Sequence, residues 1–231
     1  TSTSTVTITA DRLCVDSLNL NNINVTIDIG AAAGAGGLDA GSETANTWYY
    51  IFVISNSSGT SVNGLLSLSS TAPTMPAGYT KKRRVGAVRN DASSNFLQFV
   101  QQGNKVSYSD AMVSNRILSS GQSTTFASVS ASTFVPPTSR KAVCFFETFI
   151  VHNAAGVQFT SYFREQGSTS AQGSIAEATI VQVANVGNTQ ELTSDIDTSS
   201  TQTIEYKLSS VPTGGAAYGV YITILGYYDR F

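Results

Sequence analysis

The stretch Ile23-Asn24-Val25-Thr26-Ile27-Asp28-Ile29 alternates apolar and polar side chains at every position. Successive side chains of a β-strand point to opposite faces, so this period of two predicts a strand with one buried face. The later run Trp48-Tyr49-Tyr50-Ile51-Phe52-Val53-Ile54 is apolar on both faces, as expected of a central strand that is covered on both sides. These two stretches together indicate a protein built from sheets.

The same pattern recurs along the chain, and helical periodicity hardly appears. Ten further segments have strand character: 6–10, 65–68, 84–88, 95–101, 105–108, 142–152, 157–163, 175–186, 201–208 and 217–228. About twelve short strands separated by polar turns predict an antiparallel β-sandwich of jelly-roll type with little or no helix. We expect residues 1–231 to form a single domain. Within it, Val135-Pro136-Pro137-Thr138 predicts a lobe boundary or a crossover between sheets near 135–139.

Composition excludes several classes of protein. Charged residues make up 12% of the 231 residues, about half the usual share of roughly 25%. The formal net charge of −2 argues against a nucleic-acid-binding protein, whose affinity depends on basic side chains. No apolar run approaches the ~20 residues that span a bilayer, so we expect no membrane insertion. Thr1–Thr9 has neither an initiator Met nor a signal-peptide pattern, which predicts a processed or truncated start.

The two cysteines, Cys14 and Cys144, lie 130 positions apart. One disulfide between them is an open alternative, but we favour two buried thiols in apolar strands. The close ligand pairs of a cysteine zinc site are missing.

His152 is the only histidine, and it follows an apolar strand just before a polar turn. No Gly-x-Ser-x-Gly motif accompanies it, so we interpret His152 as an exposed or interface residue at a strand end. Asp195 and Asp197 would share one side of a strand, as would Asp11 and Asp16 if the turn between them allowed it. We interpret these pairs as solvated, with weak calcium binding or catalysis as the alternatives.

Two further segments could suggest a binding site. The glycine-rich loop Gly30–Gly37 lacks the Gly-Lys-Ser/Thr ending of a phosphate-binding loop and precedes a strand, so we interpret it as a connection. The basic run Lys81-Lys82-Arg83-Arg84 would alternate between the two faces of a strand. We expect it on an edge strand or solvated face, with an intersubunit contact as the alternative.

Aromatic side chains gather near the C-terminus: Tyr218, Tyr221, Tyr227, Tyr228 and Phe231. They could form a carbohydrate platform, but a core or subunit interface explains them better. The sequence therefore predicts no catalytic, cofactor-binding or metal-binding residue, and we expect a protein that is not an enzyme and needs no cofactor.

A more specific pattern extends over roughly the first 108 residues. It comprises Gly37-Leu38-Asp39-Ala40-Gly41, the strand Trp48-Tyr49-Tyr50, the loop Pro73-Thr74-Met75-Pro76-Ala77-Gly78-Tyr79 and the strand Arg84-Val85-Gly86. This segment resembles one found in virion proteins of tailed bacteriophages and prophages, of the tail-fibre-like or head fibre and decoration kind. The motif is structural and transfers no catalytic residue.

The resemblance implies a non-enzymatic structural protein at the surface of a bacteriophage particle, with head or tail location open. It would act through assembly and attachment, with copies of itself and other virion proteins as partners. We expect a homo-oligomer, because exposed aromatic side chains are best buried between identical copies. The resemblance to phage fibre and decoration proteins, which are often trimeric, implies a homotrimer. A carbohydrate-binding, lectin-like module that recognises a host cell-surface glycan is the alternative, and an enzyme that cleaves surface polysaccharide is a more distant one.

Overall fold

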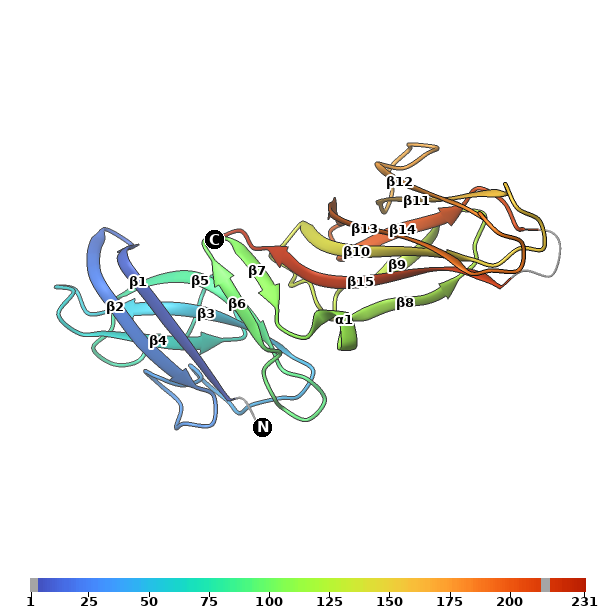
Figure 1. The fold of residues 1–231 in the computed structure, drawn as a ribbon. Coiled ribbons are helices and arrows are strands. Elements are labelled where there is room, and N and C mark those ends of the chain that lie inside the picture. Colours follow the sequence, from blue (N-terminus) through green and yellow to red (C-terminus); the bar gives the residue numbers. More distant parts are fainter. Residues whose placement is uncertain (1–3, 213–216) are drawn as a thin grey trace. The chain divides into compact units, whose positions relative to one another are not determined.

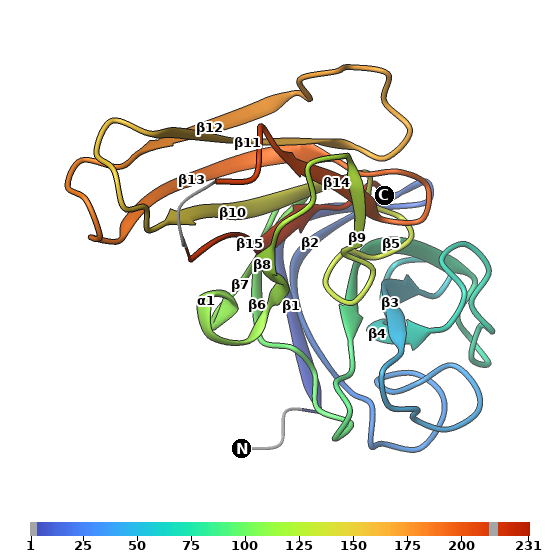
Figure 2. The ribbon, with the colours of Figure 1, turned by 90° about the vertical axis from the view of Figure 1, so that its right-hand side faces the viewer.

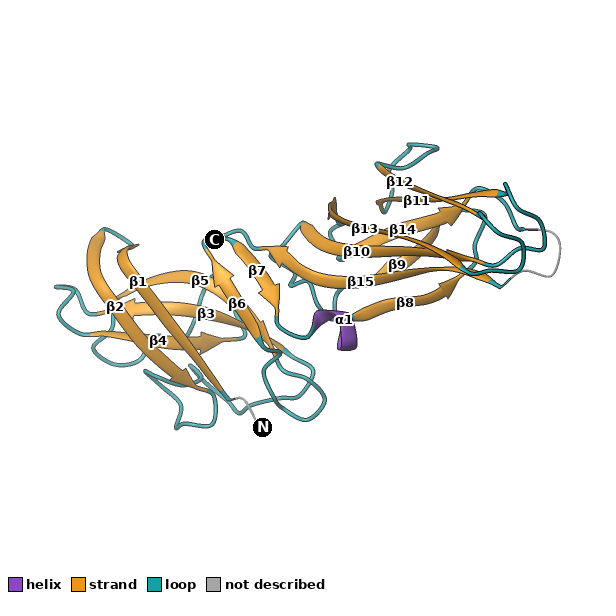
Figure 3. Cartoon of the chain, viewed as in Figure 1, coloured by secondary structure: helices purple, strands orange, loops and turns teal. Residues whose placement is uncertain are grey.

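The computed structural model describes residues 4–212 and 217–231, which fold almost entirely as β-strands joined by turns (Figure 1). In the described part of the chain the helical content is one short turn, α1 (Ala111–Ser114), drawn purple in Figure 3. Every pairing between named strands is antiparallel. The prediction of an all-β antiparallel fold with little helix is confirmed.

The chain divides into two compact units, where the sequence predicts a single domain. The first unit runs to Gln98 and includes the C-terminal Phe231, and the second is Phe99–Arg230. The segment near 135–139 lies within the second unit, between two of its strands, and does not coincide with this division.

The first unit combines a hairpin with a three-stranded sheet. The hairpin is β1 (Thr5–Val15) with β2 (Leu18–Asp28), and the sheet has β3 (Trp48–Ser55) between β4 (Val62–Ser67) and β5 (Lys81–Arg89). One face of β3 packs with the hairpin through Val53, and the other buries Tyr50, Phe52 and Ile54 beneath Met75 and Tyr79. The prediction that β3 is a central strand covered on both faces is therefore confirmed.

Close approach between β2 and β4 requires a glycine. A Cβ atom on Gly64 would lie 2.2 Å from Cγ1 of Ile27, so any side chain there would force the two strands apart.

The second unit contains the remaining strands: β6 (Phe99–Gln102), β7 (Lys105–Tyr108), β8 (Arg116–Gly121), β9 (Ala127–Ser130), β10 (Lys141–Ile150), β11 (Gln158–Glu165), β12 (Ile175–Ile180), β13 (Asn188–Asp197), β14 (Thr203–Leu208) and β15 (Tyr218–Tyr228). One sheet has the order β13-β10-β15-β7-β6, with β8 also paired to β15, and the other has the order β12-β11-β14-β9. Figure 2 shows these strands from a second direction.

Strands β8 to β15 form four nested antiparallel pairs: β8 with β15, β9 with β14, β10 with β13, and β11 with β12. Each connection along the chain crosses from one sheet to the other, except the β11–β12 hairpin. Eight strands nested in two sheets in this way form a jelly roll, as predicted. The Pro136-Pro137 segment lies in the crossover from β9 to β10.

The core of the jelly roll lies between the two sheets. On β10, the alternate residues Ala142, Cys144, Phe146, Thr148 and Ile150 are fully buried. Phe146 contacts Phe163 of the opposite sheet, with ring centroids 4.0 Å apart. Since side chains alternate along a strand, the residues between these buried positions face outward from the sandwich.

Candidate functional site

His152 has a structural position just beyond the end of β10. Its side chain is buried, which corrects the prediction of an exposed or interface histidine. Nδ1 accepts a hydrogen bond from the backbone N–H of Ala154 (3.0 Å), and the His152 carbonyl accepts one from Asn185 (2.7 Å). The imidazole therefore helps to shape the turn that follows β10.

The predicted carboxylate pairs are solvated or engaged separately. Asp195 and Asp197 share the exposed side of β13, as expected, and Asp197 lies 3.5 Å from Nζ of Lys141. Asp16 instead accepts a hydrogen bond from the backbone N–H of Lys82 (3.1 Å). In residues 4–212 and 217–231, no three His, Cys, Asp or Glu side chains come together as a metal site would require.

The loop Gly30–Gly37 uses its backbone to extend the first unit's sheet. Gly36 donates to the carbonyl of Gly64 (2.8 Å), and Leu66 donates to that of Gly37 (2.9 Å). These bonds connect the loop with β4, so the loop is a connection as predicted.

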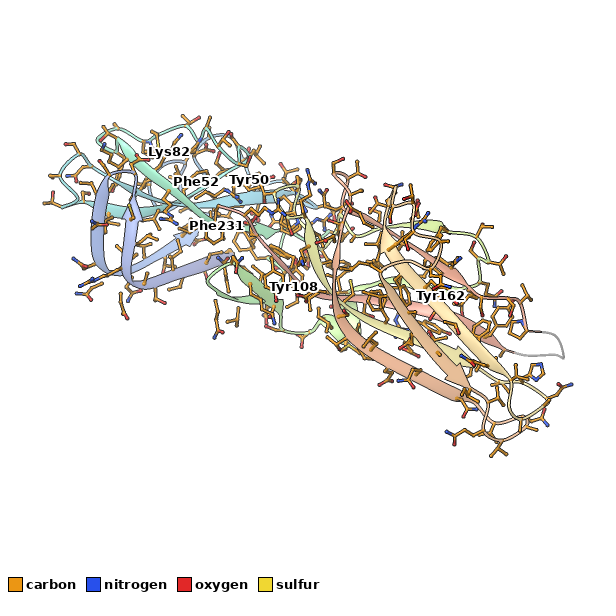
Figure 4. All side chains as sticks on the ribbon, turned by 90° about the horizontal axis from the view of Figure 1, so that it is seen from above. Tyr50, Phe52, Lys82, Tyr108, Tyr162 and Phe231 are labelled. Atoms are coloured by element: carbon orange, nitrogen blue, oxygen red, sulfur yellow. The ribbon has the colours of Figure 1, made fainter. Side chains whose placement is uncertain are left out.

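The basic run lies on β5, at the edge of the three-stranded sheet, as predicted. Arg83 donates to the carbonyl of Cys14 (3.0 Å), and Nζ of Lys82 donates to that of Thr71 (2.9 Å). The Arg84 guanidinium lies 5.7 Å from the ring centroid of Tyr50 and 5.9 Å from that of Phe231, both labelled in Figure 4. Much of this charge therefore has a structural use inside the first unit.

Both cysteines are free thiols. Cys144 is fully buried, and desolvation raises the pKa of its thiol far above the ordinary value. Cys14 is exposed, so the prediction of buried thiols is correct for Cys144 and wrong for Cys14.

The core contains a buried carboxyl group that the sequence did not single out. Glu177 of β12 points inward, where Oε2 accepts a hydrogen bond from the Thr148 hydroxyl (2.5 Å) and Oε1 has no partner. Ser161 also contacts the Thr148 hydroxyl, and Thr179 donates to the Thr148 carbonyl (3.2 Å). Burial, with a smaller effect from Glu147 and Glu191, raises the pKa of Glu177 to about 7. Glu177 is enclosed by core side chains. These surroundings fit a role in the stability of the fold better than contact with a substrate.

The outward side of the sheet formed by β13, β10, β15 and β8 carries partly exposed aromatic side chains around a charged residue, Glu147. We define the β10 face as Phe145, Glu147 and Phe149 of β10 with Tyr221 of β15. These positions alternate with buried core residues, and Tyr221 lies directly opposite Glu147. Tyr221 stacks with Arg116 (4.8 Å to the ring centroid), whose guanidinium lies 3.4 Å from Glu147. Apolar outward side chains at the middle of a sheet indicate a surface that packs against something.

The C-terminal aromatic residues are divided between core and surface. Tyr221 is partly exposed, but Tyr227 is buried, with its ring centroid 6.1 Å from that of Tyr108. The register of β15 against β10 skips Leu225, so the residues beyond this bulge change faces. Of the two positions expected for these aromatic residues, core or subunit interface, Tyr227 therefore occupies the core.

The opposite sheet has a different outward surface. We define the Phe126 cluster as Phe126, Tyr162, Arg164, Glu205 and Lys207. Arg164 lies 3.5 Å from the Phe126 ring centroid and 2.6 Å from Glu205, while Nζ of Lys207 lies 4.8 Å from the same ring. Aromatic rings and charged groups are thus combined on one partly exposed face.

No protein-family model matches the chain, and no curated protein matches it. Within the described residues, no helix is long and apolar enough to cross a membrane. The resemblance to phage virion proteins thus stays a prediction.

Proposed function

We propose that the protein is a non-enzymatic structural subunit of a bacteriophage virion that assembles into a homotrimer and acts in surface attachment. The observation that carries this proposal is the β10 face, with Phe145, Phe149 and Tyr221 on the outward side of a jelly-roll sheet. Repeated copies arranged with closed symmetry would bury this face identically in each subunit. Jelly rolls are common in viral capsid proteins and lectins, which is consistent with the proposal.

The non-enzymatic part of the proposal is supported by the positions of the residues considered for catalysis. His152 shapes a turn, Asp16 holds a backbone N–H, and Asp197 lies at the surface beside a lysine. The motif resemblance supports the virion location, with other virion proteins as further partners.

Light scattering of the purified chain tests self-assembly. We expect a mass of three times 24.3 kDa. Phe145→Asp should reduce it to that of a monomer, because an unpaired charge in an interface is strongly unfavourable. Ala178→Asp, on an exposed position of β12 in the other sheet, is the matched control and should leave the trimer intact. A 24.3 kDa wild-type species at high micromolar concentration would refute self-assembly.

Electron microscopy with labelled antibody tests the location. We expect the label at the surface of the particle, on the head or on the tail. Label absent from intact particles would contradict the virion assignment.

A carbohydrate-binding, lectin-like recognition module is the second candidate function, and the partly exposed rings of the Phe126 cluster favour it. A glycan array combined with a reducing-sugar assay separates the alternatives. Binding without cleavage supports the lectin, cleavage supports an enzyme, and neither supports a purely structural subunit.

A further inference from the structure

The Phe126 cluster is built by the register of two strands. On β11 and β14, Tyr162 lies directly opposite Lys207, and Arg164 lies opposite Glu205. The intervening residues Phe163 and Tyr206 are buried in the core, so these four side chains point outward together. Phe126, which precedes β9, places its ring beside both cations. Figure 4 labels Tyr162 on this part of the chain.

Charge within the cluster is unbalanced. The side chains of Arg164 and Glu205 are only 15% and 13% exposed and form a close ion pair, and Arg164 also donates to the Ser170 carbonyl (2.7 Å). Lys207 donates to the Ala171 carbonyl (2.5 Å), but no carboxylate of the described residues lies within 4.0 Å of its ammonium group. Two cations are therefore matched by one anion, which leaves one positive charge for a ligand.

The rings complete the chemistry of a sugar site. Nζ of Lys207 lies close to two rings, 4.8 Å from the centroid of Phe126 and 5.1 Å from that of Tyr162. No hydrogen bond joins the Tyr162 hydroxyl to a described residue, so this hydroxyl can donate to and accept from a ligand. An aromatic ring offers an apolar face to the C–H groups of a pyranose, while an ammonium group pairs with a carboxylate.

We propose that Lys207 and Tyr162 bind an acidic sugar, a pyranose that carries a carboxylate, on the outward face of this sheet. The carboxylate pairs with the Lys207 ammonium, and the ring of the sugar stacks on Tyr162. This site rests on the attachment role proposed above and gives that role a ligand class. A single unmatched charge suits one carboxylate, whereas a nucleic-acid backbone requires many.

A structural alternative is that Arg164 and Lys207 only fasten the β11–β12 connection through Ser170 and Ala171. Titration calorimetry with tetragalacturonate and sialyllactose as acidic probes separates the two. Methyl-esterified tetragalacturonate and lactose are the neutral counterparts. We expect an acidic probe to bind at least about tenfold more tightly than its neutral counterpart, and more weakly as salt increases.

Variants assign the binding to these residues. Lys207→Gln and Tyr162→Ala should each weaken binding by about tenfold or more, and Lys207→Arg should largely retain it. Lys105→Gln is the matched control, because Nζ of Lys105 lies 5.9 Å from the Tyr228 ring in the other sheet, and it should bind as the wild type does.

The thermal midpoint and the mass by light scattering are recorded for each variant. Loss of binding by folded Lys207→Gln supports the site. Equal binding of acidic and neutral probes, or no binding of either acidic probe at millimolar concentration, overturns it. Because trimer mass is measured separately, failure of this site can be distinguished from failure of the assembly proposal.

Discussion

The two outward faces of the jelly roll differ in the side chains that their central strands present. The β10 face presents the rings of Phe145, Phe149 and Tyr221 with one ion pair, whereas β11 and β14 present Arg164, Glu205 and Lys207 among aromatic rings. An apolar face is stabilised by exclusion of water against a protein surface, and a charged aromatic face can remain hydrated and exchange ligands. Under the two proposals made above, one face of the scaffold would serve assembly and the other recognition.

The sharpest test of this contrast compares two tyrosines of β15. Tyr227→Asp places a charge and a cavity in the core, so we expect a loss of about 4 kcal/mol or more, enough to unfold the second unit. Tyr221→Asp should leave the fold intact and abolish the trimer. Thermal unfolding and light scattering measure the two effects. If both variants lost only assembly, the assignment of Tyr227 to the core would be wrong.

The buried carboxyl group of Glu177, which lies between the two sheets, should make the stability of the fold depend on pH. Because the pKa of Glu177 is raised from 4.5 to about 7, the unfolded chain releases this proton more readily than the folded chain. The stabilising contribution is complete below about pH 4.5 and is lost as the pH rises to about 7, by up to about 3 kcal/mol.

Glu177→Gln should remove this part of the pH dependence, because an amide cannot ionise and its oxygen can still accept from Thr148. Urea unfolding at pH 5 and pH 7.5 provides the measurement. If the free energy of unfolding changed equally between the two pH values in wild type and variant, the assignment of this pH dependence to Glu177 would be wrong.

The ion pairs of the two faces should differ in strength. Arg164 and Glu205 are 2.6 Å apart and mostly buried, whereas Arg116 and Glu147 are 3.4 Å apart with side chains 36% and 22% exposed. We expect Arg164→Ala to reduce the free energy of unfolding by about 2 kcal/mol, since Glu205 is left without its partner. In the monomeric Phe145→Asp background, where this face is open to solvent, screening should limit Arg116→Ala to about 0.5 kcal/mol. Chemical unfolding of the two variants would disprove this ranking if their effects were equal.

The smallest effect concerns the thiols. Cys14→Ser should change stability by less than about 0.5 kcal/mol, because the side chain is exposed. Under native conditions a thiol reagent should label one cysteine per chain, and the variant should not react until it unfolds. Rapid labelling of Cys144 in the folded variant would show that its burial is incorrectly assigned.

The local hydrophobic pattern of the sequence was sufficient to predict several strands. The apolar run at β3 predicted a central strand covered on both faces, and the segment 142–152 predicted the strand β10, because both patterns are local in the sequence. Three jelly-roll strands were missed, β8, β9 and β13. Their sequences offer few apolar side chains: the ten residues of β13 include only Leu192 and Ile196. Such strands are stabilised by pairing with neighbours, which is not encoded locally.

The candidate sites were harder to predict from the sequence than the strands. No sequence motif marks Tyr162, Arg164 or Lys207, which lie on two separate segments of the chain. Only the pairing of β11 with β14 brings their side chains together. Glu177 was missed because a carboxylate in a short alternating segment predicts an outward side chain. In the structure, β12 turns Glu177 and Thr179 inward and leaves Ala176 and Ala178 exposed.

The sequence by itself determined the all-β class, the central strand β3 and the absence of a recognisable catalytic motif, since hydrophobic patterning and motif spacing are local properties. Only the tertiary structure decided how the eight strands are nested, where the chain divides into two units, and that the side chain of Tyr227 points into the core. Strand pairing joins residues far apart in the chain, and a single bulge at Leu225 reverses which side chains are buried beyond it.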